Sequence, residues 1–211
     1  MRGLIDAIAR RWRRPGPLVD LDADSEVGKS LRQKRRSGFC KAYLSGHRIL
    51  DIGVRGVANR STSLIPNAIG IDLDYPGYDG VHLPFGDATV DAVFSSHMLE
   101  HAADPLAVIR DWHRVIKVGG FIVCVVPHQF LYERRREPPS PIAADHKRFY
   151  TPGRLLDEFE AALEPNSYRV RHLADNDAGY DYGVPLDAHP LGCYEIELVV
   201  EKITPPAWRI A

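Results

Sequence analysis

The sequence predicts an α/β fold with a mainly parallel sheet, an antiparallel closing strand and helices on both faces. After residue 44, short apolar runs alternate with segments of helical period, which is typical of parallel strands joined by helices. The chain then ends in two strand-like runs with no helical pattern between them, which indicates antiparallel pairing. A length of 211 residues favours a single domain of this kind.

The predicted elements follow one another at short intervals. Four apolar runs predict the parallel strands, at residues 48–52, 68–73, 91–95 and 120–126. Before the last run, Asp104 and Pro105 predict a helix start, and Gly119-Gly120 predicts its end. Thr151-Pro152 opens a second helix in the same way. The closing strands are expected at residues 168–173 and 194–202, the second with apolar residues alternating with glutamates.

The N-terminal part has a different character from the rest of the chain. The first 41 residues hold 11 Lys and Arg against 5 acids, whereas the other 170 hold 16 against 23. Residues 1–14 predict a short basic amphipathic helix, and residues 18–28 a polar linker. We therefore expect an N-terminal helix and linker over 1–28 and one domain over 29–211. Its first helix is expected at about 29–44, weakened at Ser37-Gly38.

Composition excludes several classes of protein. No apolar run approaches the roughly 20 residues of a membrane-spanning helix, although residues 1–14 suit peripheral contact with anionic lipid. Cys40, Cys124 and Cys193 are few and far apart, which favours reduced thiols and a cytoplasmic setting over a disulfide frame or a cysteine-zinc site.

Glycines and acids follow the first two predicted strands. The first ends in Asp51-Ile52-Gly53 with Gly56 nearby, and the second ends in Asp72, nineteen residues after Gly53. In open α/β sheets such a glycine loop approaches an anionic group, and an acid about 20 residues later accepts hydrogen bonds from ribose hydroxyls. The spacing therefore predicts a nucleoside-containing cofactor.

The order of the following segments is more specific than the glycines. Leu83-Pro84-Phe85, then 90–94, then Leu99-Glu100-His101, and finally 113–120 resemble the class I S-adenosylmethionine-dependent methyltransferases over about residues 48–163. Within that group the pattern is similar to the small methyltransferases that carry LPF, LEH and KPGG segments. The resemblance implies a Rossmann-like fold, S-adenosyl-L-methionine as cofactor and methyl transfer as activity.

The resemblance also implies which residues line the first part of the cofactor site. Asp51 and Gly53 match the start of the family's first motif, whose loop faces the methionine part of the cofactor. Gly56 is shifted from the usual glycine spacing, and Arg55 stands where a second glycine is usual. Arg55 would therefore either reach the cofactor carboxylate or block its place.

Further site residues follow from the same resemblance. Asp72 matches the acid that binds the ribose diol, and Leu73 directly after it is placed in the same site. Asp79 stands where an acid would contact the adenine, or where a vestigial third strand would start. Asp79 follows Asp72 by only seven positions, which predicts a shortened third-strand region. Ser95 and Ser96 match positions beside the sulfonium and the acceptor.

Methyl transfer to a hydroxyl also requires that a proton leave. A histidine is the natural base at neutral pH, and His97, His101, His128 and His146 are the candidates, of which we select His101 and His146 as catalytic. His146 follows an arginine- and proline-rich loop, residues 134–139, that would cover the site.

Three other interpretations are less well supported by the residues. Residues 97–101 read H-x-x-E-H, a zinc-peptidase motif, but such a motif belongs within a longer helix and needs a third ligand, so no metal is predicted. A nicotinamide-dependent oxidoreductase is disfavoured because the complete Gly-x-Gly-x-x-Gly turn is missing. Nucleic acid is not an expected partner, because the body is acidic and carries no compact reader motif.

The sequence therefore predicts a cytoplasmic methyltransferase that acts on an oxygen or nitrogen of a small-molecule or glycan acceptor. The alternative is a methyltransferase-like module that has lost turnover and binds partners, which Arg55, Val57 and the shortened third-strand region would support. Residues 174–193, with Tyr180, Tyr182 and His189, are expected to shape the acceptor pocket.

Overall fold

The computed structural model describes residues 26–54, 63, 65–140 and 143–208. The predicted amphipathic helix at 1–14 and the two loop residues Arg55 and Gly56 lie outside this part of the chain. Among the described residues, every helix is too short or too polar to cross a membrane.

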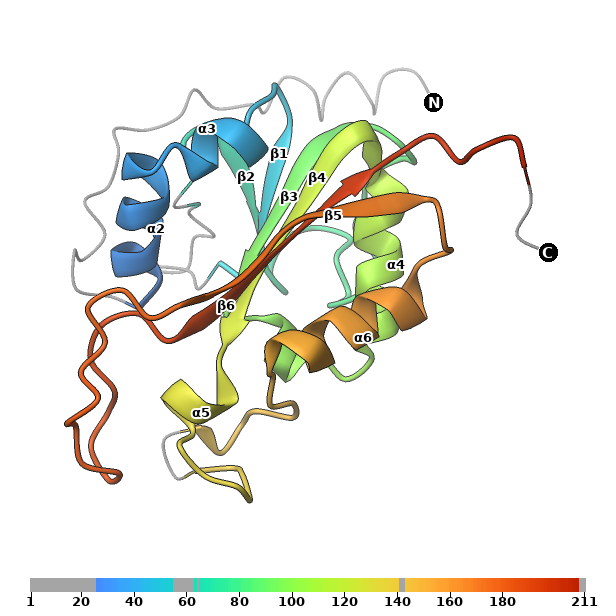
Figure 1. Cartoon of the computed structure of the whole chain (residues 1–211). Coiled ribbons are helices and arrows are strands. Elements are labelled where there is room, and N and C mark those ends of the chain that lie inside the picture. Colours follow the sequence, from blue (N-terminus) through green and yellow to red (C-terminus); the bar gives the residue numbers. More distant parts are fainter. Residues whose placement is uncertain (1–25, 55–62, 64, 141–142, 209–211) are drawn as a thin grey trace.

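In the described part of the chain, six strands form one sheet in the order β2-β1-β3-β4-β6-β5 (Figure 1). The strands β1, β2, β3 and β4 run parallel, and β6 is antiparallel to both of its neighbours, as predicted. Their bounds are Ile49–Ile52 for β1, Ala68–Ile71 for β2, Val90–Ser96 for β3, Ile116–Pro127 for β4, Tyr168–Asn176 for β5 and Glu195–Lys202 for β6.

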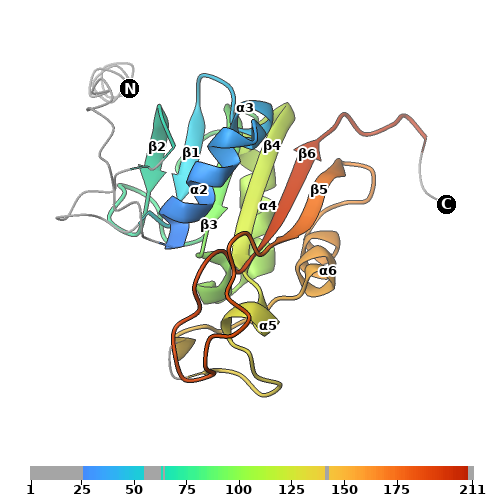
Figure 2. The same ribbon diagram turned by 60° about the vertical axis from the view of Figure 1, so that its left-hand side comes forward.

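Helices cover the two faces of the sheet (Figure 2). The pair α2 (Glu26–Arg36) and α3 (Phe39–Tyr43) packs on one face, where Leu31 joins Phe94 and Val123 in a buried cluster. On the other face, α4 (Pro105–Val115) and α6 (Pro152–Ala162) bury Trp112 and Phe159 against the larger core cluster. Two short elements complete the fold, η1 (Leu99–His101) and α5 (Gln129–Tyr132).

Both predicted helix starts are confirmed. The Asp104 carboxylate accepts a hydrogen bond from the Ala107 N–H at 3.0 Å, and Thr151 Oγ1 accepts one from the Arg154 N–H at 3.4 Å. These side chains satisfy N–H groups that have no partner within a first helical turn. The break at Ser37-Gly38 is also confirmed, because Gly38 has φ +84 between α2 and α3.

Three details differ from the prediction. Helix α2 begins at Glu26, so the boundary placed after residue 28 falls inside a helix. Helix α4 ends at Val115 rather than at Gly119-Gly120, and β4 begins directly at Ile116 and runs through both glycines. The N–H groups of Ala88 and Thr89, just before β3, donate to carbonyls in the last turn of α4. The end of α4 therefore lies beside the start of β3, and the chain continues from α4 directly into β4.

The third difference concerns β6. The pattern at residues 194–202 predicts apolar residues on one face and glutamates on the other, yet the first six residues of β6 are all buried. Glu195 and Glu197 are covered by α2, whose Lys34 forms ion pairs with both carboxylates. A buried cation on a neighbouring helix is the reason that these acids tolerate the interior.

Candidate functional site

The candidate site lies where the parallel strands end. Ile52 of β1 is in register with Ile71 of β2 and with Ser95 of β3, so the residues that follow these strands meet at one edge of the sheet. In parallel α/β sheets this edge is where ligands bind. The predicted site residues that the structure places at it are Asp51, Gly53, Asp72, Ser95 and Ser96.

Gly53 makes the turn that follows β1. It has φ +83, a conformation that side-chain-bearing residues rarely adopt, and its N–H donates to the Ile71 carbonyl at 2.9 Å. A Cβ at this position would lie 2.6 Å from the Cβ of Met98. The glycine therefore permits both the bend and the close approach of the segment that follows β3.

Asp51 and Asp72 are in different environments. Asp51 is buried, and one of its carboxylate oxygens accepts a hydrogen bond from Ser63 Oγ at 2.7 Å, so it ties the chain after the glycine loop to β1. Asp72 is half-buried, and its Oδ1 accepts the N–H of Leu73 at 2.8 Å. Leu73 is 72% exposed. Asp72 thus presents a carboxylate at the surface of the edge beside an exposed apolar side chain.

Asp79 is held by a local turn. Its Oδ1 accepts the N–H groups of Val81 and His82, at 2.9 and 2.7 Å, and its Oδ2 lies 2.8 Å from His82 Nδ1. These hydrogen bonds lower the pKa of Asp79 well below its ordinary value. Residues 72–89, all of which are described, form no strand, so the shortened third-strand region is a loop here. The contact of Asp79 with adenine stays a prediction.

Ser95 and Ser96 end β3 on opposite faces of the sheet. Ser95 is fully buried, and within the described structure its Oγ has no hydrogen-bond partner. His97 follows with φ +54, which turns the chain sharply out of the strand and into η1. The H-x-x-E-H segment is therefore a bend and a short 3-10 turn, and its two histidines do not share the face of an α-helix.

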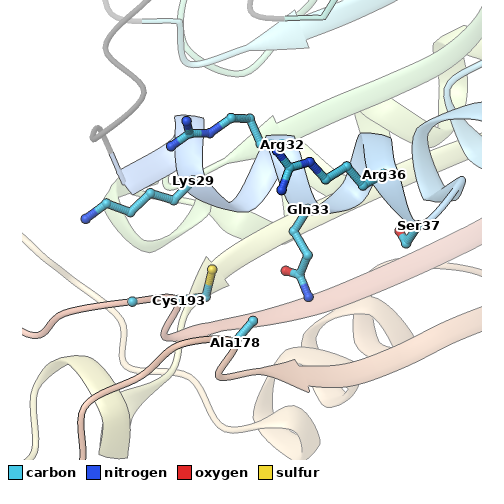
Figure 3. A pocket seen from close by; sticks show the side chains of 8 residues that line it. Lys29, Arg32, Gln33, Arg36, Ser37, Ala178 and Cys193 are labelled. Carbon is cyan, nitrogen blue, oxygen red and sulfur yellow. The ribbon is translucent and has the colours of Figure 1, made fainter.

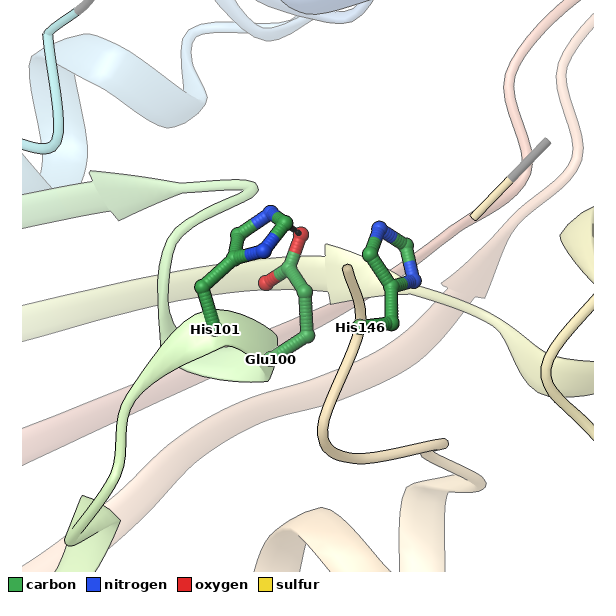
Figure 4. Close-up of side chains that lie close together, drawn as sticks. All are labelled: Glu100, His101 and His146. Atoms are coloured by element: carbon green, nitrogen blue, oxygen red, sulfur yellow. Dashed lines mark ion pairs between the residues drawn. The ribbon is translucent and has the colours of Figure 1, made fainter. Parts of the chain in front are cut away.

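The two histidines selected from the sequence lie together. The ring centroids of His101 and His146 are 4.9 Å apart and the rings are nearly perpendicular. The buried side chain of Glu100 lies beside them (Figure 4). His146 also stacks on Tyr132, and its Nδ1 is 3.4 Å from Glu133 Oε1. Burial lowers the pKa of His146, and the neighbouring His101 acts in the same direction, so His146 is neutral at pH 7 and can accept a proton or bind a cation.

A buried charge network extends from this cluster to α2. His97 Nε2 is 3.2 Å from Glu195 Oε1, and Lys34 Nζ is 3.1 Å from the other oxygen of that carboxylate. Burial alone would raise the pKa of Glu195, but Lys34 and His97 outweigh burial and lower it to about 2. Glu195 and Glu197 likewise outweigh burial at Lys34 and raise its pKa. The network fixes α2 over the edge at which β6 begins.

A cavity of about 730 Å³ opens between α2 and the loop before β6 (Figure 3). Its lining residues include Lys29, Arg32 and Arg36 from the helix and Ala178, Gly192 and Cys193 from the loop. This loop lies at the same edge as the ends of the parallel strands, because Glu195 of β6 is in register with Pro127 of β4. Its three cationic side chains make the cavity basic. It lies at the edge of the sheet that bears Gly53 and Asp72, but neither of these residues lines it.

The sequence interpretation missed Lys34, Glu133 and Glu195 as parts of the site. Lys34 stands among arginines on a helix that resembles a solvated charged face, and only its burial separates it from them. Glu195 is a glutamate in a strand with an alternating pattern. One signal was available in the sequence. A charged residue in a strand next to the centre of the sheet is expected to be buried, and a buried charge needs an opposite charge from a helix that covers it.

Comparison with known proteins supports one family. Residues 51–124 match the family model described as a methyltransferase domain. The match begins at Asp51, spans Gly53, Asp72 and the histidine-bearing turn, and ends in the middle of β4. It thus covers the ends of β1, β2 and β3, which form the candidate site.

Curated relatives are distant. The demethylmenaquinone methyltransferase of Lysinibacillus sphaericus is 38% identical over 60 residues, which is 26% of each chain. The uncharacterized protein YafS of Escherichia coli is 28% identical over 193 residues, which is 84% of this chain and 77% of that protein. The chain spans 26% to 44% of the length of the first three curated relatives that it matches.

A solved structure shares the fold. A chain from the complex between the Haloferax volcanii Trm112 methyltransferase activator and a methyltransferase superposes with a TM-score of 0.54 at 20% identity. The superposition covers 85% of this chain and 94% of that chain. At this identity the likeness concerns the fold.

Proposed function

We propose that this chain, which carries the methyltransferase domain and has the class I methyltransferase fold, is an S-adenosylmethionine-dependent methyltransferase that acts on an oxygen or nitrogen of a small-molecule or glycan acceptor. The observation that carries the proposal is the meeting of Gly53 and Asp72 at one edge, directly after adjacent parallel strands. The positive φ of Gly53 supports a backbone cradle for an amino-acid tail, and the carboxylate of Asp72 suits a ribose diol.

The residues present fit S-adenosylmethionine. A side chain at position 53 would fill the bend, and Asp72 keeps its carboxylate at the surface of the edge with Leu73 exposed beside it. When bound, the cofactor supplies an activated methyl group on a sulfonium. The protein's own contribution is to hold the acceptor atom in line with that methyl, and positioning of this kind is worth roughly 7–11 kcal/mol of barrier.

We assign the acceptor's proton to the pair His101 and His146. His101 follows β3 and Met98 in the chain, and His146 lies beside it. Met98 packs against Gly53, so the two histidines lie near the turn that follows β1. His146 has a side chain that is only 8% exposed, and its lowered pKa keeps it neutral, as a proton acceptor at neutral pH must be.

The basic cavity beside α2 supports an acceptor that carries an anionic group. Cationic side chains of α2 line one side, and the loop of residues 178–193 lines the other. A second hollow of about 470 Å³ is lined by residues 134–136, all arginines, together with Tyr180 and Tyr182 of the loop that we expect to shape the acceptor pocket. Arg134 donates to backbone carbonyls of the facing loop, at Val184, Pro185 and Ala188. Arg135 and Arg136 are exposed, and guanidinium groups bind phosphate or carboxylate in two-point fashion.

The test is transfer of label. The purified protein is incubated with methyl-labelled S-adenosylmethionine and a metabolite extract, and products are identified by mass spectrometry. We expect a labelled product that is retained by an anion-exchange resin, and loss of more than about nine-tenths of the label in Asp72→Ala, because the charged hydrogen bonds to the ribose are lost. Asp74→Asn, two residues away at the same exposed turn, is the matched control and should retain wild-type transfer.

A second candidate is a binding module without turnover. The departure that favours it is Arg55 where the family usually has a glycine. In the same experiment, a protein that binds the donor and yields no labelled product would support this alternative. Replacement of Arg55 by glycine would then be expected to leave donor binding intact or to strengthen it.

A further inference from the structure

Glu100, His101 and His146 bring three metal-ligating groups to one point (Figure 4). One ligand atom from each residue lies within 4.8 Å of the others, and His101 Nε2 is 3.8 Å from Glu100 Oε1. The two segments that carry them are far apart in sequence, and the Lys147 N–H joins them by a hydrogen bond of 2.9 Å to the Glu100 carbonyl. The cluster is thus held by backbone as well as by side chains.

Each histidine has an outer carboxylate on its Nδ1 side. His101 Nδ1 is 3.4 Å from Asp145 Oδ2, and His146 Nδ1 is 3.4 Å from Glu133 Oε1. Glu133 is itself buried, and its other oxygen accepts the Ser140 N–H at 2.6 Å. Neither carboxylate contact is a hydrogen bond: within the described structure Glu133 Oε1 has no hydrogen-bond partner, and His101 Nδ1 makes its hydrogen bond with the Asp145 carbonyl. Metal-binding histidines characteristically donate one ring N–H to a carboxylate or a backbone carbonyl, which fixes the tautomer and turns the other nitrogen toward the ion.

We propose that Glu100, His101 and His146 bind one divalent transition-metal ion of the Zn²⁺ or Mn²⁺ type. Two imidazoles and one carboxylate form a donor set that suits such ions, with water or a substrate oxygen in the remaining positions. Ligand atoms around a tetrahedral zinc lie about 3.4 Å apart, given bonds of about 2.1 Å. The present spacing therefore requires side-chain movements of about 1 Å to reach that geometry.

This donor set differs from that of the zinc-peptidase motif H-x-x-E-H. In that motif both histidines are ligands and the glutamate acts as a base. Here the His97 ring lies between two acids, with Nε2 3.2 Å from Glu195 Oε1 and Nδ1 4.0 Å from Glu100 Oε1. His146, from the loop before α6, supplies the second imidazole of the cluster. The sequence carries no signal for His146 as a ligand, because no spacing rule relates it to residues 97–101.

The position of the cluster indicates how the ion would serve the proposed activity, and this consequence rests on that activity. Met98, directly before η1, contacts the cofactor-loop glycine Gly53, so the ion would lie close to the transferable methyl group. A hydroxyl bound to a divalent ion is far more acidic than a free one. With the ion bound, this role replaces the direct acceptance of the proton by His101 and His146 proposed above: the two histidines would hold the ion, and the acceptor's proton would leave to solvent.

The test is a metal titration of the full chain without a histidine tag. The protein is stripped with chelator and dialysed, then titrated separately with Zn²⁺, Mn²⁺ and Co²⁺, with calorimetry and Co²⁺ absorption as readouts. We expect one ion per chain, and roughly tenfold or more weaker binding in His101→Gln, His146→Gln and Glu100→Gln. His82→Gln changes an exposed histidine outside the cluster and should bind as the wild type does.

Folding is checked by circular dichroism, and His101→Gln is the decisive variant because its side chain is 34% exposed. Absence of stoichiometric binding, or equal binding by His82→Gln and His101→Gln, would overturn the proposal. A thiolate charge-transfer band with Co²⁺ would also overturn it, because it would place the ion on a cysteine. Donor binding is measured in parallel, so a failed metal site leaves the proposed function standing, and the reverse also holds.

Discussion

At the scale of single residues, the turn after β1 depends on the missing side chain of Gly53. Its φ of +83 and the neighbouring Met98 both exclude a Cβ. The sequence was sufficient to predict a turn at this glycine, because a glycine directly after a buried strand in an α/β pattern has few other uses. It could not predict that Met98 is the neighbour, since that contact joins segments far apart in the chain.

Gly53→Ala should lower the free energy of unfolding by about 2 kcal/mol, since a left-handed backbone costs an L-residue roughly 1–2 kcal/mol before Met98 moves aside. Gly153→Ala is the control, because Gly153 lies in α6 with open space around its Cβ position. That variant should be neutral or more stable by up to about 1 kcal/mol. Urea unfolding measures both, and equal stability of the two variants would contradict the turn described here.

At the scale of elements, helix starts were predictable and the burial of β6 was not. Asp104 and Thr151 cap helices through hydrogen bonds to residues three positions away, so local sequence suffices to recognise them. The glutamates of β6 are buried because Lys34 reaches them from a helix 161 positions before Glu195. The alternation of apolar and acidic residues in β6 does not show whether a distant residue pairs with the acids. It therefore predicted that the glutamate face is exposed, whereas α2 covers that face.

The ion pair of Lys34 with β6 should make stability depend on pH in acid. The pKa of Glu195 in the folded protein is about 2, below its ordinary value of 4.5, so its charge stabilises the fold above pH 4.5. That stabilisation is lost as the pH falls from 4.5 through the lowered pKa of the folded protein. Glu195→Gln should flatten the decline in unfolding free energy over this range.

Glu201→Gln is the matched control for that measurement, because Glu201 lies on the same strand and pairs with the more exposed Arg171. It should keep the wild-type slope over the same acid range. Parallel curves for Glu195→Gln and the wild type, measured by urea unfolding at each pH, would show that the carboxylate is not held charged by Lys34.

At the scale of the whole molecule, the sheet order places distant segments at one edge. The ends of β1, β2 and β3, the turn through η1 and the loop before β6 all meet there. The places of the strands along the chain, and of Gly53 and Asp72 after the first two, followed from apolar runs and their spacing, whereas the order of the strands in the sheet comes from the structure. The joining of His146 to His101 did not, because the long loop between β4 and α6, interrupted only by the short α5, has no periodicity from which its path can be inferred.

The central claim is that this edge binds S-adenosylmethionine through Asp72, and calorimetric titration with S-adenosylhomocysteine tests it most directly. Charged hydrogen bonds are worth about 1.5–3 kcal/mol, so Asp72→Ala should weaken binding by about tenfold or more, while Asp74→Asn should not. We predict a single site per chain with that difference between the two variants. Binding that is the same in the wild type and in Asp72→Ala, or absent from the wild type, would contradict it.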